Sequence, residues 1–306
     1  MDMVRSMIRG HAIQYNLQRR VDWGMRAHRA IGPPWPGTFE EIVATFLFAV
    51  RAIAVFVWTT SVFAVRMLGR PLRFVSPKLE LAYRAACLSI WGRGVLPLLG
   101  ARIRLVGNPP ARPFFLVCNH QTLLDMVLLW AVVDTAYVSK DEVADWPLIG
   151  TMARGMDTIF INRESARDTM RVNALIKESL DRGLGITVFA EGGCGDGTGV
   201  IPFKAPLLQP VAVLNMPVHY AVINYRTPKG TMPPGTVMVW REGVTFPQYC
   251  VDVMKMPWFE ATIEFGDTPK CGTERKKLAH ELWEDVNARF VPVNVKTESG
   301  EIAPIN

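Results

Sequence analysis

Beyond residue 100, the hydrophobic positions follow two alternating patterns. Short apolar runs bounded by Gly, Pro, Asn or Asp predict strands, and longer segments with apolar residues three and four positions apart predict helices. The predicted strands are 102–106, 114–118, 136–139, 158–161, 186–190, 218–224, 237–240 and 261–265. The predicted helices are 123–133, 166–181 and 273–290. Strands that alternate with helices indicate an α/β fold, a mixed sheet flanked by helices.

The most apolar segment comes earlier, at residues 42–65, and Arg51 interrupts it. About 20 apolar residues suffice to span a bilayer, and an arginine at the centre costs about 2.5 to 3.5 kcal/mol. A second segment, 79–99, is amphipathic and carries Arg84 and Arg93. We expect an N-terminal pair of membrane-associated helices, either with one span or lying in one leaflet. A buried helical hairpin of a soluble protein is the alternative.

Two breaks rich in Pro and Gly, at 32–37 and 107–113, divide the chain. We therefore expect a polar, basic N-terminal segment at 1–37, membrane-anchoring helices at 38–100 and an α/β domain at 101–306. The first thirty residues lack the apolar core of a secretory signal.

Charge is unevenly distributed. Residues 1–110 carry 15 Lys and Arg against 5 Asp and Glu, whereas the whole chain has a net charge of only +6. Basic residues beside apolar helices favour the anionic cytoplasmic leaflet by about 1 kcal/mol each. We therefore expect the chain at the cytoplasmic face of the inner membrane. Nucleic acid is a poor partner, because these charges flank an apolar stretch and no nucleic-acid-binding fold is recognisable.

The five cysteines form no CxxC pair, so the sequence indicates neither a disulfide framework nor a zinc site. A turn at 192–197 has the GxxxxG spacing, but Thr198 stands where a nucleotide-binding loop requires lysine. There is also no GxSxG motif of serine hydrolases. We expect no metal and no cofactor.

The strongest chemical signal is the sequence from Asn119 to Asp125, which follows the apolar run 114–118 directly. His120 is placed in the turn after a buried strand, and Asp125 in the first turns of the following helix. A carboxylate bonded to one ring nitrogen fixes the tautomer of a histidine and makes the other nitrogen more basic. The pattern predicts a general base for a hydroxyl. A lone histidine at a strand end can also be a capping or core residue.

This block has the form NHxxxxD and resembles that of the glycerolipid acyltransferases of the lysophosphatidate acyltransferase family. Residues 137–140 with 158–163 resemble the family's second block, 189–193 the third, and 203–207 with 217–218 the approach to the fourth. The resemblance covers residues 79 to 290 in the family's order. It implies that His120 and Asp125 form a catalytic dyad. It also suggests a substrate-binding group consisting of Asn119, Lys140, Arg163, Glu191, Gly192, Gly193 and Lys204.

The third block departs from the family pattern. Gly193-Cys194 stands where the family usually has Thr-Arg, so the arginine that would grip an acceptor phosphate is missing. The following Gly-Asp-Gly is similar to the turn in lyso-ornithine-lipid acyltransferases, which also lack that arginine. An acceptor without a phosphate monoester is therefore a serious alternative to lysophosphatidate.

The resemblance implies transfer of a fatty acyl group from acyl-CoA or acyl carrier protein to a lysolipid hydroxyl at a membrane surface. The thioester is already activated, so His120 needs only to take the hydroxyl proton while N–H groups stabilise the oxyanion. A route through the thiol of Cys118 or Cys194 ranks lower. The sequence also leaves open an amine acceptor and a non-catalytic protein that binds lipid.

Overall fold

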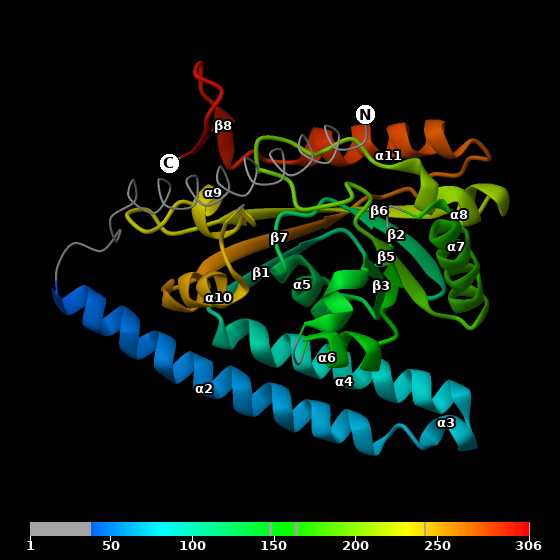
Figure 1. Ribbon diagram of the computed structural model, residues 1–306, viewed down its shortest axis with the longest axis horizontal. Coiled ribbons are helices and arrows are strands. Elements are labelled where there is room, and N and C mark those ends of the chain that lie inside the picture. Colours follow the sequence, from blue (N-terminus) through cyan, green and yellow to red (C-terminus); the bar gives the residue numbers. More distant parts are fainter. Residues whose placement is uncertain (1–37, 147–148, 163–164, 242, 306) are drawn as a thin grey trace, which may run out of the picture.

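The computed structural model describes residues 38–146, 149–162, 165–241 and 243–305. A helical layer lies along one side of an α/β domain (Figure 1) and consists of α2 (Thr38–Leu68), α3 (Leu72–Val75) and α4 (Pro77–Leu98). The predicted segment 1–37 lies outside the described residues. Within them, the two predicted apolar segments fall in α2 and α4.

Seven strands of the described residues form one sheet in the order β1-β7-β6-β2-β5-β3-β4. The five from β6 to β4 are parallel, β7 is antiparallel to β6, and β1 is parallel to β7. The expected mixed sheet is therefore confirmed. Its strands are β1 (Ala101–Val106), β2 (Phe114–Cys118), β3 (Thr135–Lys140), β4 (Ile159–Ile161), β5 (Gly185–Val188), β6 (Val218–Arg226) and β7 (Phe259–Phe265). A separate hairpin contains β8 (Asn294–Lys296) and β9 (Ile302–Pro304).

Strand β2 is fully buried, and its side chains belong to two apolar cores, one on each face of the sheet. Phe114, Leu116 and Cys118 belong to one core, and Phe115 and Val117 to the other. This division follows from the period of two in a strand, and an apolar run without alternation is typical of a strand covered on both faces.

Helices cover both faces (Figure 1). On the face of the helical layer lie α5 (Leu124–Val132), α6 (Ile149–Gly155) and α10 (Phe246–Lys255). The short helix α9 (Pro234–Val237) contacts α10 and β9. On the opposite face lie α7 (Ala166–Asp181), α8 (Gln209–Val213) and α11 (Arg275–Arg289). Two short 3-10 helices, η1 (Asp141–Asp145) and η2 (Ala205–Leu208), join these elements. Local signals set some of the boundaries: Ser165 caps α7 by accepting the Asp168 N–H, and Pro77 opens α4 after the cap Ser76.

The prediction of a strand at 237–240 is wrong. Pro233, Pro234 and Gly235 begin the short helix α9 instead, which ends at Val237. Proline fixes its own φ and suits the first turn of a helix, and this local constraint overrides the apolar run that follows. The next residues are still placed firmly, because the Trp240 N–H donates to the Gln121 carbonyl at 2.7 Å.

Helix α2 packs along α4 and α10 and leaves a long apolar stripe exposed. The stretch Ile42–Val75 is long and apolar enough to cross a membrane, with a mean hydropathy of 2.1 and only 6% of its most apolar window buried. Arg51, the charge that interrupts it, donates to the carbonyls of Met254, Met256 and Pro257 at the end of α10. The charge in the apolar helix is thus bonded to the α/β domain.

A buried arginine joins the helical layer to the domain. Arg84 of α4 is fully buried, and it reaches Asp134 at 3.0 Å, Asp157 at 3.6 Å and the Met156 carbonyl at 3.2 Å. Arg112 also pairs with Asp134. Since a buried charge without partners is costly, this cluster fixes α4 against the loops that follow α5 and α6.

We predict that Arg84→Met lowers the free energy of unfolding by about 1 to 3 kcal/mol, because the Met156 carbonyl loses a buried hydrogen bond and the partly exposed carboxylates of Asp134 and Asp157 lose a charged partner. Chemical denaturation in mild detergent, followed by circular dichroism, measures this change. The matched control is Arg93→Met on the same helix, where the side chain is exposed and its Nε donates one hydrogen bond to the Ala131 carbonyl. Equal losses for the two variants would contradict the role of the cluster.

Candidate active site

The candidate site lies where the central strand β2 ends. β2 pairs with β5 on one side and β6 on the other, and its last residue is Cys118. The turn 119–123 then leads into α5, which begins at Leu124. In open α/β sheets, ligands bind beyond the carboxyl ends of the parallel strands. His120 and Asp125 therefore stand at the edge of the sheet where a substrate is expected.

The two side chains meet as predicted. His120 Nδ1 lies 2.8 Å from Asp125 Oδ2, and the same oxygen accepts the N–H groups of Gln121 at 2.7 Å and Thr122 at 2.9 Å. The other oxygen, Oδ1, accepts the hydroxyl of Tyr225 from β6. The Asp125 side chain is 1% exposed. Its carboxylate thus closes the turn and holds the histidine ring at once.

The His120 ring is enclosed but not sealed, since its side chain is 13% exposed. Phe189 stacks on one face, with ring centroids 4.1 Å apart and planes at 17°. With Nδ1 bonded to Asp125, the opposite ring nitrogen, Nε2, is the atom left to exchange a proton with a substrate.

Glu191 fixes the backbone around the dyad. Its two carboxylate oxygens accept the N–H of His120 at 2.6 Å and the N–H of Ile201 at 2.7 Å. Only 3% of Glu191 is exposed. Burial raises the pKa of its carboxyl to about 7, although the two N–H bonds oppose this rise. Glu191 therefore positions the turn that carries His120.

The Gly-rich turn after Glu191 wraps around His120. The Gly195 N–H donates to the His120 carbonyl at 2.7 Å. Gly192 has a φ of +81° and Gly197 a φ of +80°, a backbone conformation that favours glycine. A Cβ at Gly193 would meet nothing within 4 Å, so the turn is open at that residue.

The other residues predicted for the site differ in where they lie: some are buried beside His120 and Asp125, and others are on the surface. Asn119 is buried at 1% exposure, and its amide exchanges two hydrogen bonds with the Ile223 backbone of β6. Lys204 lies against Gly192 beside the Gly-rich turn. Lys140 pairs with Glu142 on the surface. Arg163 lies outside the described residues. Asn119 and Glu191 thus support the dyad, while Lys204 and Gly193 lie on the accessible side of the turn.

Sequence reasoning missed three side chains around the dyad. They are Phe189, which covers the ring, Tyr225, which bonds to Asp125, and Tyr249 of α10, which bonds to the Thr122 hydroxyl. Tyr225 and Tyr249 lie 100 and 127 residues from these partners along the chain, and no local pattern marks them. Phe189 is the first residue of the third block, and its place two residues before Glu191 was the available signal.

Neighbouring groups set the proton affinity of the site. Burial lowers the pKa of the His120 imidazole, but charge and a hydrogen bond from Cys194, together with Asp125, raise it to about 10. Burial raises the pKa of the Tyr225 hydroxyl well above its usual value, so it remains a donor to Asp125. Burial likewise raises the pKa of the Cys118 thiol, which is unsuited to act as a nucleophile.

Known proteins with similar sequences are acyltransferases. A family model described as Acyltransferase matches residues 102–223. A 1-acyl-sn-glycerol-3-phosphate acyltransferase of Neisseria meningitidis is 35% identical over 148 residues, which are 47% of this chain and 58% of that protein. A lyso-ornithine lipid O-acyltransferase of Brucella abortus is 27% identical over 260 residues, 78% of this chain and 94% of that protein.

A solved structure shares the fold. The 1-acyl-sn-glycerophosphate acyltransferase of Thermotoga maritima superposes with a TM-score of 0.61 over 81% of this chain and 95% of that one, at 18% identity. Residues 102–223 thus match the Acyltransferase model, and the chain is similar to glycerolipid acyltransferases, in agreement with the resemblance of its motifs. It spans less than two thirds of the length of the two Neisseria relatives, 58% and 66%.

We predict that the His120 imidazole titrates with a midpoint above 6.5, the ordinary value, because Cys194 and Asp125 favour its protonated form despite burial. NMR of labelled histidine, with His120→Asn to assign the signal, measures it. Cys194→Ala should lower the midpoint, whereas Cys271→Ala, which removes an exposed thiol, should not. A wild-type midpoint at or below 6.5 would contradict the described contacts.

Proposed function

We propose that this protein is a lysophospholipid O-acyltransferase that uses His120 as a general base oriented by Asp125. The observation that carries the proposal is the 2.8 Å contact between His120 Nδ1 and Asp125 Oδ2 at the end of the central strand, beside an incompletely covered ring. Fatty acyl transfer from acyl-CoA or acyl carrier protein to a lysolipid hydroxyl requires a general base with a ring nitrogen that can accept the hydroxyl proton. The relatives' names support the same reaction class.

In the proposed reaction, the acceptor hydroxyl gives its proton to His120 Nε2 as its oxygen attacks the thioester carbonyl. The oxygen–carbon bond forms, the carbon–sulfur bond breaks, and the proton passes to the departing thiolate. Asp125 stabilises the imidazolium that forms in between. Backbone N–H groups of the Gly-rich turn would stabilise the oxyanion. The neutral imidazole is the active form, so the rate should rise with pH through the pKa of His120.

A second acceptor class, the lyso-ornithine lipids, is supported by a specific feature of the turn. Gly193 and Cys194 stand where the family has Thr-Arg, so the turn lacks the guanidinium that would bind a phosphate monoester. Gly193 leaves open space there, and Cys194 contacts His120. Lys204, which lies against Gly192, is a candidate cation and would contact a phosphate or carboxylate only as a point charge. Mass spectrometry of products from lysophosphatidate, other lysophospholipids, lyso-ornithine lipid and simple amines would identify the acceptor and separate ester from amide products.

We further propose that the helical layer lies in one leaflet and does not cross the bilayer. Helix α2 is tied along its length: Arg51 bonds to the end of α10, the Trp58 indole donates to the Trp91 carbonyl, and Arg66 pairs with Glu80. Its outward stripe is apolar, with Ile42, Phe46, Val50, Ile53, Phe56, Val57 and Leu68 exposed. A helix fixed to the domain on one side and apolar on the other suits an interfacial position.

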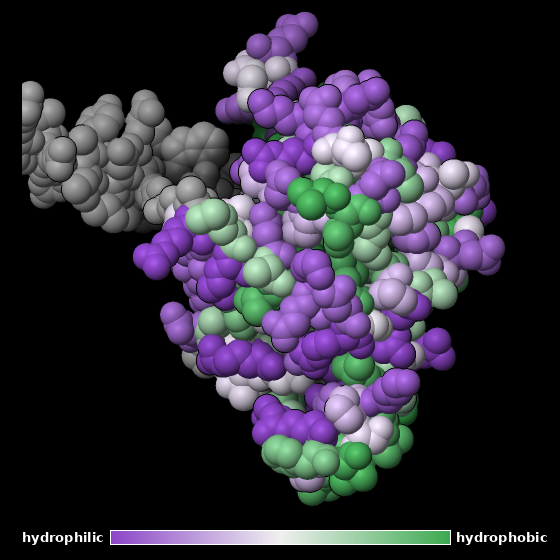
Figure 2. Space-filling view, turned by 90° about the vertical axis from the view of Figure 1, so that its right-hand side faces the viewer, coloured by the Kyte–Doolittle hydropathy of each residue, from purple (hydrophilic) through white to green (hydrophobic). Residues whose placement is uncertain are grey.

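Basic residues stand at the end of this stripe, where Figure 2 shows apolar and hydrophilic surface side by side. Arg70, Arg73 and Lys78 are exposed next to the exposed Phe74 and Leu79. Such an arrangement places apolar side chains among acyl chains and cationic groups at anionic headgroups. We propose on this basis that the protein sits on the cytoplasmic face of the inner membrane.

We predict that His120→Ala and Asp125→Asn each reduce acyl transfer at least about 100-fold, the lower range for loss of a general base. Thioester consumption measured with purified protein would show this. The matched control is His219→Ala, a half-buried histidine on β6. Cys118→Ala and Cys194→Ala should remain active. Near-normal turnover by His120→Ala would exclude the dyad, and loss of turnover by Cys194→Ala alone would favour the thiol route.

We predict that the protein floats with vesicles containing phosphatidylglycerol and resists release by high salt, because apolar burial holds it. Replacing Phe46, Ile53 and Phe56 together by Ser should release it into solution. The control is a triple replacement of exposed apolar residues on the α/β domain, Met170, Val213 and Val291, which should leave flotation unchanged. Complete release of the wild type by salt would refute apolar anchoring.

A further inference from the structure

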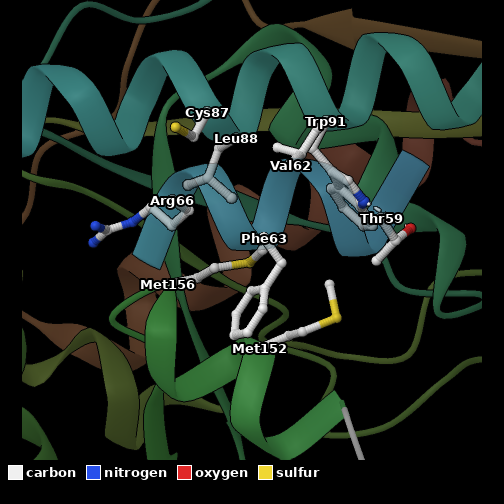
Figure 3. A pocket seen from close by; sticks show the side chains of 9 residues that line it. All are labelled: Thr59, Val62, Phe63, Arg66, Cys87, Leu88, Trp91, Met152 and Met156. Carbon is white, nitrogen blue, oxygen red and sulfur yellow. Dashed lines mark hydrogen bonds between the residues drawn. The ribbon is translucent and has the colours of Figure 1, made fainter. Parts of the chain in front are cut away.

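The helical layer and the C-terminal segment contact the α/β domain in different ways. Between α2, α4 and α6 is a small space with room for about one water molecule, and most of its lining is apolar (Figure 3), including Val62, Leu88, Trp91 and Met156. The C-terminal segment 290–305 leaves α11 on the far side of the domain from that layer (Figure 1) and ends in the hairpin β8–β9. Polar groups of this segment bond to the Gly-rich turn beside His120.

The start of the hairpin binds the turn through three hydrogen bonds. The N–H groups of Val293 and Asn294 both donate to the Gly197 carbonyl, at 2.9 and 3.0 Å. The Asn294 amide nitrogen Nδ2 donates to the Asp196 carbonyl at 2.6 Å. Val293 and Asn294 are buried, with 3% and 4% of their surface exposed, so water competes little for these bonds. Two neighbouring residues thus hold consecutive carbonyls of the turn.

Helix α9 fixes the Asn294 side chain from the other side. The same Nδ2 donates to the Gly235 carbonyl of α9 at 3.2 Å. A Cβ at Gly235 would lie 1.8 Å from Asn294 Oδ1 and 2.4 Å from the Val293 carbonyl oxygen, so this close approach requires glycine. The N–H of Ile305, the residue after β9, donates to the Val293 carbonyl at 2.9 Å. The Asn294 amide is therefore held between α9 and the Gly-rich turn.

Helix α11 holds the later part of the same turn. Asn287 Oδ1 accepts the Val200 N–H at 3.1 Å, and the Trp283 indole N–H donates to the Val200 carbonyl at 2.8 Å. Both backbone groups of Val200 are therefore bonded to side chains of α11. The turn is thus anchored at two places by residues that follow it by 80 positions or more in the chain.

The contacts with the proposed base come just before these anchors. The Gly195 N–H donates to the His120 carbonyl at 2.7 Å, and the Cys194 side chain bonds to the imidazole. Asp196 is the next residue, so the Asn294 amide holds the backbone one position from the contact with His120. Loss of this amide would release the backbone beside the groups that touch the base.

We propose that Asn294 is a positioning residue for acyl transfer, which holds the Gly-rich turn against His120. The inference rests on the proposed function, in which His120 takes the proton and N–H groups of this turn stabilise the oxyanion. Stabilisation of this kind requires donors that are in place before the reaction, and a displacement of about 1 Å can cost about 100-fold in rate. Asn294 acts through the backbone of Asp196 and Gly197 and not by contact with the substrate.

The test is Asn294→Ala in the full chain, which removes both bonds of the amide. We expect kcat for acyl transfer to fall about 10-fold or more, because the oxyanion donors are no longer held in place. NMR of labelled histidine gives a second measurement that does not depend on turnover. The titration midpoint of His120 should move down toward that of Cys194→Ala, because the turn no longer holds Cys194 at the ring.

The matched control is Asn224→Ala on β6. The Asn224 amide also makes two hydrogen bonds, donating to the Arg289 carbonyl at 3.1 Å and accepting the Val291 N–H at 2.8 Å. It thus ties the same end of the chain to the sheet, and both of its partners lie outside the Gly-rich turn. Asn224→Ala should therefore keep the wild-type kcat and the wild-type His120 midpoint, although it also loses stability.

A wild-type kcat and midpoint in Asn294→Ala would overturn the proposal, and so would equal changes in both variants, since these would indicate general loosening of the C-terminal segment. If Asn294→Ala does not fold by circular dichroism, Trp283→Phe is measured against the same control. It removes one donor to the turn, keeps a ring, and should move the midpoint in the same direction. A wild type that transfers no acyl group to any acceptor refutes the proposed function, and the His120 midpoints then test the positioning by themselves.

Discussion

The structure around the site depends on the carboxylate of Asp125. It accepts four hydrogen bonds, from the backbone of Gln121 and Thr122, from the His120 ring and from the Tyr225 hydroxyl. In a site of low dielectric, a buried carboxylate is tolerable only when its oxygens are satisfied in this way. The same bonds close the turn between β2 and α5 and join it to β6, so the fold and the proposed base are held by one group. The spacing of five residues between the two side chains is what allows a single turn to bring them together.

The helical layer also contains charged residues in apolar surroundings, and these are stabilised by partners on the α/β domain. Arg51 and Arg84 interrupt segments that are otherwise fit for lipid or for a core, and each finds its partners on the α/β domain: Arg51 on the carbonyls at the end of α10, Arg84 on Asp134 and Asp157. Because these partners belong to the domain and not to the bilayer, the arginines fix the orientation of the layer. The outward face of α2 can then be largely apolar while the layer stays attached to the domain.

The Gly-rich turn, the proposed acceptor side, is built differently from the proposed base. The Gly-rich turn contacts His120 through the Gly195 N–H and through Cys194, and it leaves space at Gly193. The residues that fix the dyad are buried and paired, whereas the residues facing this turn are small or carry a charge on a long, flexible stem, as Lys204 does. The His120–Asp125 pair is thus held by many bonds, whereas the turn beside it has room at Gly193.

The amino-acid sequence alone was enough to predict the mixed α/β sheet, the two N-terminal helices and the contact between His120 and Asp125, because each depends on neighbours in the chain: the strand period, the apolar runs and the spacing of the two residues. Local signals failed at 237–240, where prolines began a helix in an apolar run. Long-range contacts in the fold showed that Tyr225 and Phe189 contact the His120–Asp125 pair, that Asn119 and Glu191 bond to backbone, and that Arg51 bonds to the end of α10. These contacts join residues far apart in the chain, and hydrogen bonding and packing between such residues leave no periodic trace in the sequence.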